Sequence, residues 1–411
     1  MSEWKKVAAE SFCDSVRDGT HDTPKQVECG YKLVTAKHIS NGQIDLSDAY
    51  LISESDYLKI NERSKVEKWD VLMSMIGNGL GKSAVVKDNP QYAIKNLALF
   101  KIGDEVKAKW LHYYLSSQAG QGFIFNSLQG SGQPFISLSL LRKFPIPVPD
   151  DEKVMQDIVS ILSRYDSLIE NYQKQIKLLE EAAQRLYKEW FVDLHFPGHE
   201  NTKIIDGVPE GWEKKKLIEF GCTLESGSRP KGGVDSNLKD GIPSVGAENV
   251  IGLGKYNYSS EKLITNQFYS QMRKGKIKDR DILIYKDGAY IGRTSLFQDG
   301  FPHKEMAINE HVFLLHTLNE NYQYYVFFTL YQKQYFEKMQ KLNKNAAQPG
   351  LNQKALLDLG MLSPSETFVL AFRKAIDPLM KALFNKARQI RLLIEARDRL
   401  LPKLMNGEID F

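Results

Sequence analysis

The chain has 411 residues, which is too long for one ordinary domain core and predicts two or three domains. Its composition, 42% hydrophobic and 26% charged, excludes disordered and fibrous proteins, and no apolar run reaches the roughly 20 residues that a membrane span needs. A net charge of +4 permits a nucleic-acid partner without requiring one.

The N-terminal segment and the cysteines indicate the compartment. The segment that begins Met1-Ser2-Glu3 lacks the apolar core of an export signal. The three cysteines are scattered, so they give neither a disulfide framework nor the spacing of paired metal ligands. We therefore expect a soluble protein of the reducing cytoplasm.

Residues 1–150 have the sequence pattern of an α+β domain, with short strands and helices. Short strand-like runs, such as residues 71–73, are bounded by Gly, Asn, Asp and Pro. Residues 110–117 have helical periodicity and many aromatic side chains. The adjacent Tyr113 and Tyr114 are assigned to core packing rather than to base stacking.

Residues 151–197 form a first helical region. From Leu162 to Trp190 the apolar residues recur at alternating spacings of three and four, the a/d seam of helices that pack along their length. Ser163, with Asp166 three residues later, is the expected N-cap. A helix from there to Trp190 would be roughly 40 Å long. The central seam residues are Ile169, Tyr172, Ile176, Leu179 and Leu186.

Residues 198–364 repeat the α+β texture of the first domain. A strand-like run at residues 282–284 is again bounded by turn residues, and residues 322–336 are again helical and aromatic. We expect a second domain of similar fold here.

Residues 365–411 form a second helical region. Asp377 is the expected N-cap, with Pro378 at the first helical position, where a missing N–H costs nothing. Lys386 and Arg397 interrupt the seam that follows. Its central residues are Leu383, Ile390, Leu393 and Leu400.

The second half of the chain restates the first at a nearly constant offset. The corresponding segments are 4–6 with 212–214, 30–39 with 241–250, 70–73 with 281–284, 77–83 with 288–294, 133–134 with 348–349, and 175–179 with 389–393. Such constancy predicts two copies of one unit, a globular domain followed by a helix.

The two helical regions are expected to pair with each other. Acidic residues outnumber basic ones in residues 151–190, whereas basic residues outnumber acidic ones in residues 366–404. A seam together with opposite charge favours an antiparallel pair, which would relate the two halves by an approximate two-fold axis. The alternative is two independent surface helices. A spacer near 40 Å would set two domains about one DNA turn, roughly 34 Å, apart.

Three motifs resemble catalytic sequences, and each departs from its pattern. Residues 77–83 lack the leading glycine of a phosphate loop. Their repeat partner at 287–294 keeps two glycines followed by a basic and a hydroxyl residue, but loses the glycine between them. We therefore interpret both segments as hairpin turns. Residues 89–92 fall short of a methyltransferase Asn-Pro-Pro-Tyr loop. His195 and His199 are separated by Pro and Gly, which forbid a helical metal pair. We predict no catalytic residue and no metal ligand.

Polar residues near strand ends are the predicted DNA contacts, because Lys and Arg suit phosphates while Arg, Asn, Gln and His suit base edges. In the first domain they are Arg17, Thr20, His21, Lys37, His38, Asn78, Lys82 and Gln133. In the second domain they are Ser228, Arg229, Lys231, Glu248, Asn249, Lys286, Tyr290, Arg293 and Gln348. For each of these residues the alternative is a solvated loop side chain without a DNA contact. For His21 and His38 a further alternative is a buried, hydrogen-bonded histidine.

Three segments carry a family resemblance. They are LYKEWFVDLHFPGHE at residues 186–200, VPEGW at 208–212 and LLPKLMNGEID at 400–410. They resemble conserved regions of the specificity subunits of type I restriction–modification systems. The resemblance covers the whole chain, although the recognition domains of the family vary too much for their contacts to be transferred.

The resemblance implies an α+β fold with two similar target-recognition domains, separated by a pair of long antiparallel coiled-coil helices in a pseudo-two-fold repeat. It implies a bipartite double-stranded DNA target, two methyltransferase subunits docked on the helices and a motor/nuclease subunit for cleavage. S-adenosylmethionine, Mg and ATP are expected on those partners, with no cofactor in this chain. A prokaryotic, nucleoid-associated, cytoplasmic protein of defence against foreign DNA is expected.

Two other classes of function stay open at this point. A self-sufficient DNA methyltransferase or nuclease would need a cofactor-binding motif that the sequence does not display. An interaction scaffold without a DNA role would bind partner proteins but would prefer no DNA sequence.

Overall fold

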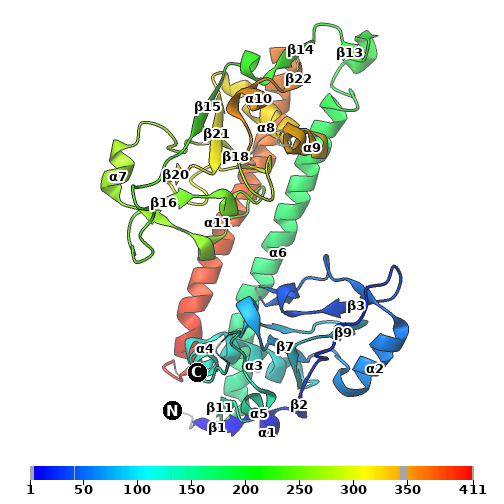
Figure 1. Ribbon diagram of the computed structural model, residues 1–411, viewed down its shortest axis with the longest axis vertical. Coiled ribbons are helices and arrows are strands. Elements are labelled where there is room, and N and C mark those ends of the chain that lie inside the picture. Colours follow the sequence, from blue (N-terminus) through cyan, green and yellow to red (C-terminus); the bar gives the residue numbers. More distant parts are fainter. Residues whose placement is uncertain (1–3, 41, 131, 343–349, 410–411) are drawn as a thin grey trace. The chain divides into compact units, whose positions relative to one another are not determined.

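The chain folds into two compact units. The computed structural model describes residues 4–40, 42–130, 132–342 and 350–409. Unit 1 consists of Met1–Leu168 and Leu393–Phe411, and unit 2 consists of Ile169–Leu392. Each unit has its own sheets, helices and hydrophobic core (Figure 1). The division cuts through both long helices, so it differs from the four-part division predicted from the sequence.

Unit 1 is built on two main sheets. An antiparallel four-stranded sheet has the order β2-β10-β7-β8, and a three-stranded sheet has the order β6-β3-β9, in which β3 and β9 are parallel. Smaller pairs are β1 with β11 and β4 with β5. The strands are β1 (Trp4–Ala8), β2 (Ser15–Asp18), β3 (Tyr31–Val34), β4 (Ile39–Ser40), β5 (Gln43–Ile44), β6 (Leu51–Ile52), β7 (Val71–Ser74), β8 (Ser83–Val85), β9 (Tyr92–Ile94), β10 (Leu97–Lys101) and β11 (Pro145–Pro149).

Helices cover the sheets of unit 1 and connect its strands. They are α1 (Ala9–Phe12), α2 (Glu54–Ser64), α3 (Glu105–Ser116), α4 (Gln118–Asn126) and α5 (Leu138–Arg142), with the 3-10 turns η1 (Ala36–His38) and η2 (Gly77–Gly79). The first part of α6 (Glu152–Phe191) and the last part of α11 (Glu366–Met405) complete the unit.

Unit 2 has the same two main sheets. The four-stranded sheet has the order β15-β21-β18-β19, and the three-stranded sheet has the order β17-β16-β20, in which β16 and β20 are parallel. Smaller pairs are β12 with β13 and β14 with β22. The strands are β12 (Ile204–Ile205), β13 (Val208–Pro209), β14 (Glu213–Lys216), β15 (Cys222–Ser226), β16 (Ile242–Val245), β17 (Leu263–Ile264), β18 (Ile282–Tyr285), β19 (Thr294–Leu296), β20 (Ala307–Ile308), β21 (Val312–Thr317) and β22 (Gly360–Ser363).

The helices of unit 2 also follow the pattern of unit 1. They are α7 (Asn266–Gln271), α8 (Gln323–Tyr331), α9 (Lys333–Leu342) and α10 (Gln353–Leu357), with the 3-10 turns η3 (His199–Asn201), η4 (Leu217–Phe220), η5 (Ala247–Asn249), η6 (Tyr258–Ser260) and η7 (Glu320–Tyr322). Strand order, strand direction and the parallel pair match between the units, so the duplication predicted from the sequence is confirmed, as is the α+β class.

The duplication extends to single turns. Trp69 and Arg280 both have left-handed backbone, with φ of 65° and 64°. The next residue, Asp70 or Asp281, is buried and accepts a hydrogen bond from the backbone N–H three residues upstream, at 2.7 Å and 2.8 Å. Burial raises the pKa of both carboxyls. These bonds favour a backbone conformation that non-glycine residues seldom adopt.

A repeated tyrosine anchors each long helix to its own domain. In unit 1 the Tyr113 hydroxyl donates to Asp166 Oδ2 at 2.6 Å, and in unit 2 the Tyr324 hydroxyl lies 3.1 Å from Asp377 Oδ1 and 2.6 Å from Gln298 Oε1. Burial raises the pKa of both tyrosines, so each hydroxyl keeps its proton. The predicted core role of the paired tyrosines is confirmed, because all four are buried.

The predicted helix starts were wrong. Helix α6 begins at Glu152 and α11 at Glu366, so Ser163 and Asp377 lie inside helices. Apolar residues upstream of Ser163, such as Ile158 and Leu162, extend the buried face toward the N-terminus. Asp166 and Asp377 are therefore not part of helix starts, and each binds a tyrosine instead.

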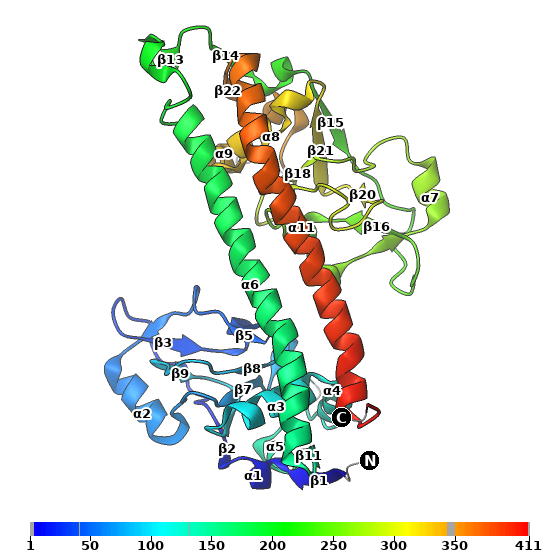
Figure 2. The same cartoon turned by 180° about the vertical axis from the view of Figure 1, so that it is seen from behind.

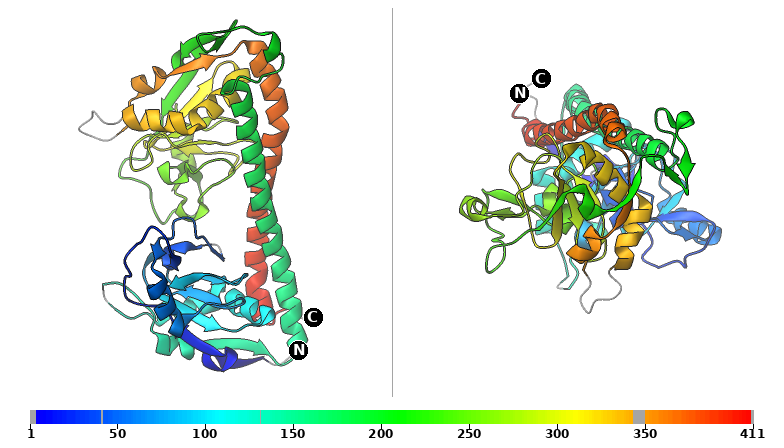
Figure 3. Two further views of the ribbon diagram at one scale, coloured as in Figure 1. Left: turned by 90° about the vertical axis from the view of Figure 1, so that its right-hand side faces the viewer. Right: turned by 90° about the horizontal axis from the view of Figure 1, so that it is seen from above.

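Segments of α6 and α11 pack side by side within each unit (Figure 2). In unit 2 they run antiparallel, because the Lys386 Nζ lies 4.9 Å from the Tyr172 ring centre and the Phe372 ring lies 6.1 Å from that of Tyr187. In unit 1, Arg397 on α11 donates to Asp166 on α6 at 2.8 Å. Arg397 and Lys386 were predicted to interrupt the seam, yet both bridge the two helices. The helical segments line one side of each unit (Figure 3).

The predicted seam residues lie along this packing to different depths. Ile169, Ile176 and Leu383 are buried, whereas Tyr172, Leu179, Leu186, Ile390, Leu393 and Leu400 are half-buried. Toward the end of α6 the fully buried positions shift to Ala183, Tyr187 and Phe191. A straight helix has 3.6 residues per turn, so it drifts away from a seam repeating every 3.5 residues and turns these side chains toward the core of unit 2.

Replacing Tyr113 by Phe should destabilise the protein by about 1.5–3 kcal/mol, because a hydrogen bond to a carboxylate is lost from a buried hydroxyl. Urea denaturation of the purified chain measures this. Tyr114→Phe is the matched control, since Tyr114 is also in the core but its hydroxyl has no hydrogen bond within the described part of the chain. Equal denaturation midpoints for the two variants would contradict the anchoring role.

Candidate nucleic-acid interface

Polar loops gather at one edge of unit 1, where the parallel strands β3 and β9 end. Lys95 N donates to Val34 O at 2.9 Å, and Thr20 N donates to Ile94 O at 3.0 Å, so three chain segments meet there. The η2 turn also lies beside η1, since a Cβ on Gly79 would be 3.5 Å from Ala36 O. We call residues 19–21, 35–38, 75–82 and 95–96 loop edge 1.

The same edge exists in unit 2, where β16 and β20 end. Asn309 N donates to Val245 O at 3.0 Å, and Lys286 N donates to His311 O at 3.0 Å. We call residues 227–229, 246–249, 286–293 and 309–311 loop edge 2. Because the carboxyl ends of neighbouring parallel strands meet at one edge of a sheet, both edges follow from the topology.

At each loop edge a glycine allows two backbone segments to approach closely. A Cβ on Gly19 would lie 2.3 Å from Ile94 O, and a Cβ on Gly227 would lie 2.0 Å from Ile308 O. No real side chain tolerates such distances, so both positions require glycine for the close approach of two backbones. The residues after each glycine are thereby fixed next to the end of the parallel strand.

The glycine-rich segments that resembled a phosphate loop are hairpin turns. Gly81 N donates to Ser74 O at 2.9 Å and Gly292 N donates to Tyr285 O at 2.9 Å, closing equivalent turns between antiparallel strands. Both glycines have positive φ, 81° and 85°. The backbone N–H groups thus bond within the turn, and the hairpin interpretation is confirmed.

Two predicted DNA contacts are buried instead. His38 and Asn249 occupy equivalent positions in η1 and η5 and are 1% and 0% exposed. His38 Nδ1 accepts from Thr35 N at 2.8 Å, and Asn249 Oδ1 accepts from Gly246 N at 3.2 Å. Burial lowers the pKa of His38, which keeps the ring neutral. Their side chains cap backbone groups, which speaks against a base contact.

Other predicted residues of unit 1 lie on or near loop edge 1. Lys37 pairs with Asp48 at 2.9 Å, and Lys82 is exposed on the hairpin. His21 is exposed and bonds Asn96 Oδ1 at 2.8 Å and Asp18 Oδ2 at 3.0 Å.

The remaining predicted residues of unit 1 differ in how close they come to the edge. Thr20 is half-buried and accepts from Asp22 N at 3.1 Å, and exposed Gln133 lies beside Gly77. Arg17 lies on β2, and its guanidinium donates to Arg63 O at 3.0 Å.

Loop edge 2 holds most of the predicted residues of unit 2. Arg229 pairs with Glu310 at 2.8 Å, and Lys286 Nζ donates to Glu310 O at 3.2 Å. The Arg293 guanidinium lies 3.9 Å from the centre of the Tyr290 ring.

Of four further predictions in unit 2, two also lie on loop edge 2 (Ser228 and Glu248), Lys231 lies just beyond it, and Gln348 cannot be placed. Glu248 pairs with Lys262 at 3.0 Å, and Ser228 and Lys231 are exposed loop residues. Gln348 lies outside the described residues. In unit 1 the same holds for the side chain of Asn78, whose backbone is part of η2.

Sequence reasoning missed polar residues within three positions of the ends of the parallel strands. They are Lys95 and Asn96 in unit 1, and Glu310 and His311 in unit 2. The strands before them, β9 and β20, are only three and two residues long, so alternation gave no signal. The end of a short buried apolar run was the available clue.

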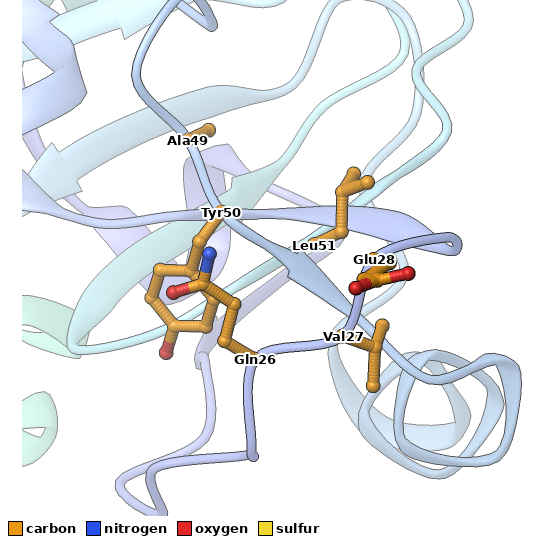
Figure 4. A pocket seen from close by; sticks show the side chains of 6 residues that line it. All are labelled: Gln26, Val27, Glu28, Ala49, Tyr50 and Leu51. Carbon is orange, nitrogen blue, oxygen red and sulfur yellow. The ribbon is translucent and has the colours of Figure 1, made fainter.

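A shallow pocket in unit 1 lies apart from the predicted contacts. It is lined by Gln26, Val27, Glu28, Ala49, Tyr50 and Leu51 (Figure 4). One carboxylate, one amide and one phenol do not form a catalytic or metal-binding set.

The described residues contain neither a cluster of metal ligands nor a membrane-spanning helix. No three His, Cys, Asp or Glu side chains there gather as metal ligands would. No described helix has both the length and the apolarity to cross a membrane.

Comparisons with known proteins agree with this architecture. Residues 1–181 match the family described as "Type I restriction modification DNA specificity domain". The specificity subunit of the type I restriction enzyme MjaIX from Methanocaldococcus jannaschii is 28% identical over 313 residues, which cover 74% of this chain and 70% of that protein. The MjaVIII specificity subunit of the same organism is 25% identical over 372 residues, covering 86% and 83%.

A solved structure shows the same fold. The S subunit of a type I restriction-modification system from M. genitalium aligns with a TM-score of 0.56 and 17% identity, covering 98% of this chain and 96% of that one. A repeated α+β domain, each copy followed by a long helix, defines a duplicated recognition protein. Over most of its length the chain is similar to the specificity subunits of type I restriction–modification systems, and residues 1–181 match the DNA specificity domain of that family. Such subunits recognise the DNA target, and catalysis lies in the partner subunits of the complex.

Replacing Gly227 by Ala should destabilise unit 2 by about 1–3 kcal/mol, because the methyl group would overlap the carbonyl of Ile308. Thermal unfolding of the purified chain measures the loss. Gly360→Ala is the control, since a Cβ there meets nothing within 4 Å and its φ is not positive. If both variants unfold at the wild-type temperature, the proposed role of the glycine in holding the edge together is refuted.

Proposed function

We propose that the chain recognises a bipartite double-stranded DNA target, with one half-site bound at each loop edge and an unread gap between them. The observation that carries this proposal is the repetition of the edge: the same buried scaffold presents two different sets of exposed polar side chains. Lys and Arg there would bind phosphates, and the remaining polar groups would contact base edges. Because the two sets differ, the half-sites need not have the same sequence.

The long helices support a fixed gap between the half-sites. Each has 40 residues, or about 60 Å at 1.5 Å per residue, and each contributes residues to both units. A continuous helix resists bending, so the gap would be set by helix length rather than by a flexible linker.

The helices would also dock the partners. Leu178 on α6 and Leu392 on α11 are each 63% exposed, and Leu168 and Leu370 on the same two helices are exposed as well. Exposed leucines on a helix are typical of a protein interface. Two methyltransferase subunits would bind here, and a motor/nuclease subunit would join them for cleavage. Those partners would bring S-adenosylmethionine, Mg and ATP, and the assembly would act on DNA in the cytoplasm of a prokaryotic cell, at the nucleoid.

Exchanging residues 1–150 for those of another specificity subunit should change one half-site and leave the other intact, because each loop edge belongs to one unit. Sequencing of methylated sites in cells that carry the chimera with its methyltransferase partner measures this. The wild-type chain is the control. A chimera that changes both half-sites together would contradict one half-site per unit.

Inserting four residues near Gln175 should change the length of the gap or abolish binding, since α6 would lengthen by roughly 6 Å and rotate the residues beyond the insertion. Selection from a pool of duplexes with randomised gaps, by the complex with its methyltransferase partner, measures the preferred spacing. The same insertion in the exposed loop near Gly232 should leave the spacing unchanged. An unchanged gap and affinity for the helix insertion would refute the spacing role.

A further inference from the structure

One position shows how the two copies differ in chemistry. The second residue after the closely packed glycine of each loop edge, Gly19 or Gly227, is His21 in unit 1 and Arg229 in unit 2. Each pairs with the side chain that follows the parallel strand: His21 with Asn96 at 2.8 Å, and Arg229 with Glu310 at 2.8 Å. The backbone places both pairs at the same point of the repeat, so their difference is one of side chains alone.

Arg229 is exposed and lies beside a carboxylate. Its side chain is 59% exposed, and its Nε lies 2.8 Å from Glu310 Oε1. Nε is the guanidinium nitrogen nearest to this carboxylate, and the two Nη groups are further donors of the same side chain. A guanidinium held at its base presents two donors in a fixed plane.

Glu310 is in turn held by its neighbours. The side chain is 28% exposed, and its two carboxylate oxygens are buried. The Lys286 ammonium donates to the Glu310 backbone carbonyl, and His311 Nε2 lies 3.4 Å from Glu310 Oε1. The His311 ring is fixed by Asp287, 2.7 Å from its Nδ1. Neither carboxylate oxygen accepts a hydrogen bond within the described residues, so a guanidinium close by compensates the buried charge and the ion pair favours keeping Arg229 beside Glu310.

We infer that Arg229 is a specificity-determining residue that contacts a guanine in the half-site of unit 2, with Glu310 as its positioning residue. The inference rests on the proposed function. A planar pair of donors matches the O6 and N7 acceptors that guanine alone presents together in the major groove. Unit 1 carries a histidine at this position, so no arginine reads the equivalent base of its half-site.

The alternative for Arg229 is a contact with a phosphate. A phosphate contact adds affinity for every sequence, whereas a guanine contact adds it for one base at one position. The two roles therefore differ in which base is preferred and not merely in how tightly DNA binds.

The test uses the complex of the full chain with its methyltransferase partner and selection from a pool of random duplexes. Arg229→Ala should lower the preference for guanine at one position by roughly 10- to 100-fold and leave other positions unchanged. Glu310→Gln should lower the preference at the same position by a smaller factor, since it keeps the arginine but loses its ionic partner. Lys239→Ala, at an exposed cation of unit 2 that is not among the predicted DNA contacts, is the matched control and should leave the motif unchanged.

The outcomes separate this inference from the proposed function. The chimera with exchanged residues 1–150 identifies which half-site belongs to unit 2. A wild-type complex that enriches no bipartite motif would overturn the proposed function. A wild-type bipartite motif that Arg229→Ala leaves intact, weakens uniformly, or changes at a base other than guanine or in the half-site of unit 1 overturns the inference alone.

Discussion

The close approach of two backbones at the end of a parallel strand pair is the constraint on which both loop edges depend. Gly19 and Gly227 bring their chains so near to β9 and β20 that a Cβ would overlap a carbonyl oxygen. In unit 1 the hydrogen bonds across this contact use backbone atoms, so they place the following residues independently of their side chains. The edge can therefore keep its shape while the exposed side chains change.

This separation of scaffold and side chains explains how one fold can serve two half-sites. The buried parts of the repeat are chemically alike: Asp70 and Asp281 cap the same turn, and Tyr113 and Tyr324 each contact an aspartate on a long helix. The exposed parts are not alike. Specificity for DNA lies in contacts to base edges, so divergence confined to the edges changes what is recognised without changing the fold.

Sequence patterns predicted what is local or repeated. The offset between the halves revealed the duplication, and hairpin glycines and helical periodicity placed the turns and long helices. The patterns gave incomplete or wrong predictions for residues whose role depends on which side chains become buried. His38 was predicted to contact DNA, with a buried histidine as the alternative, and it caps its own backbone. Arg397 was predicted to interrupt the seam but pairs with Asp166, and Ser163 was predicted to cap α6 but lies inside it. Glu310 was missed because its role comes from a neighbour distant in sequence, Arg229.

The central claim is that two copies of one edge bind two different half-sites of a single DNA target. Sequencing of methylated bases across the genome of the host, with and without the gene for this chain, tests it most directly. The account predicts a motif that depends on the gene and consists of two unlike specific blocks separated by a gap of constant length. A single continuous motif, or no methylation that depends on the gene, would contradict it.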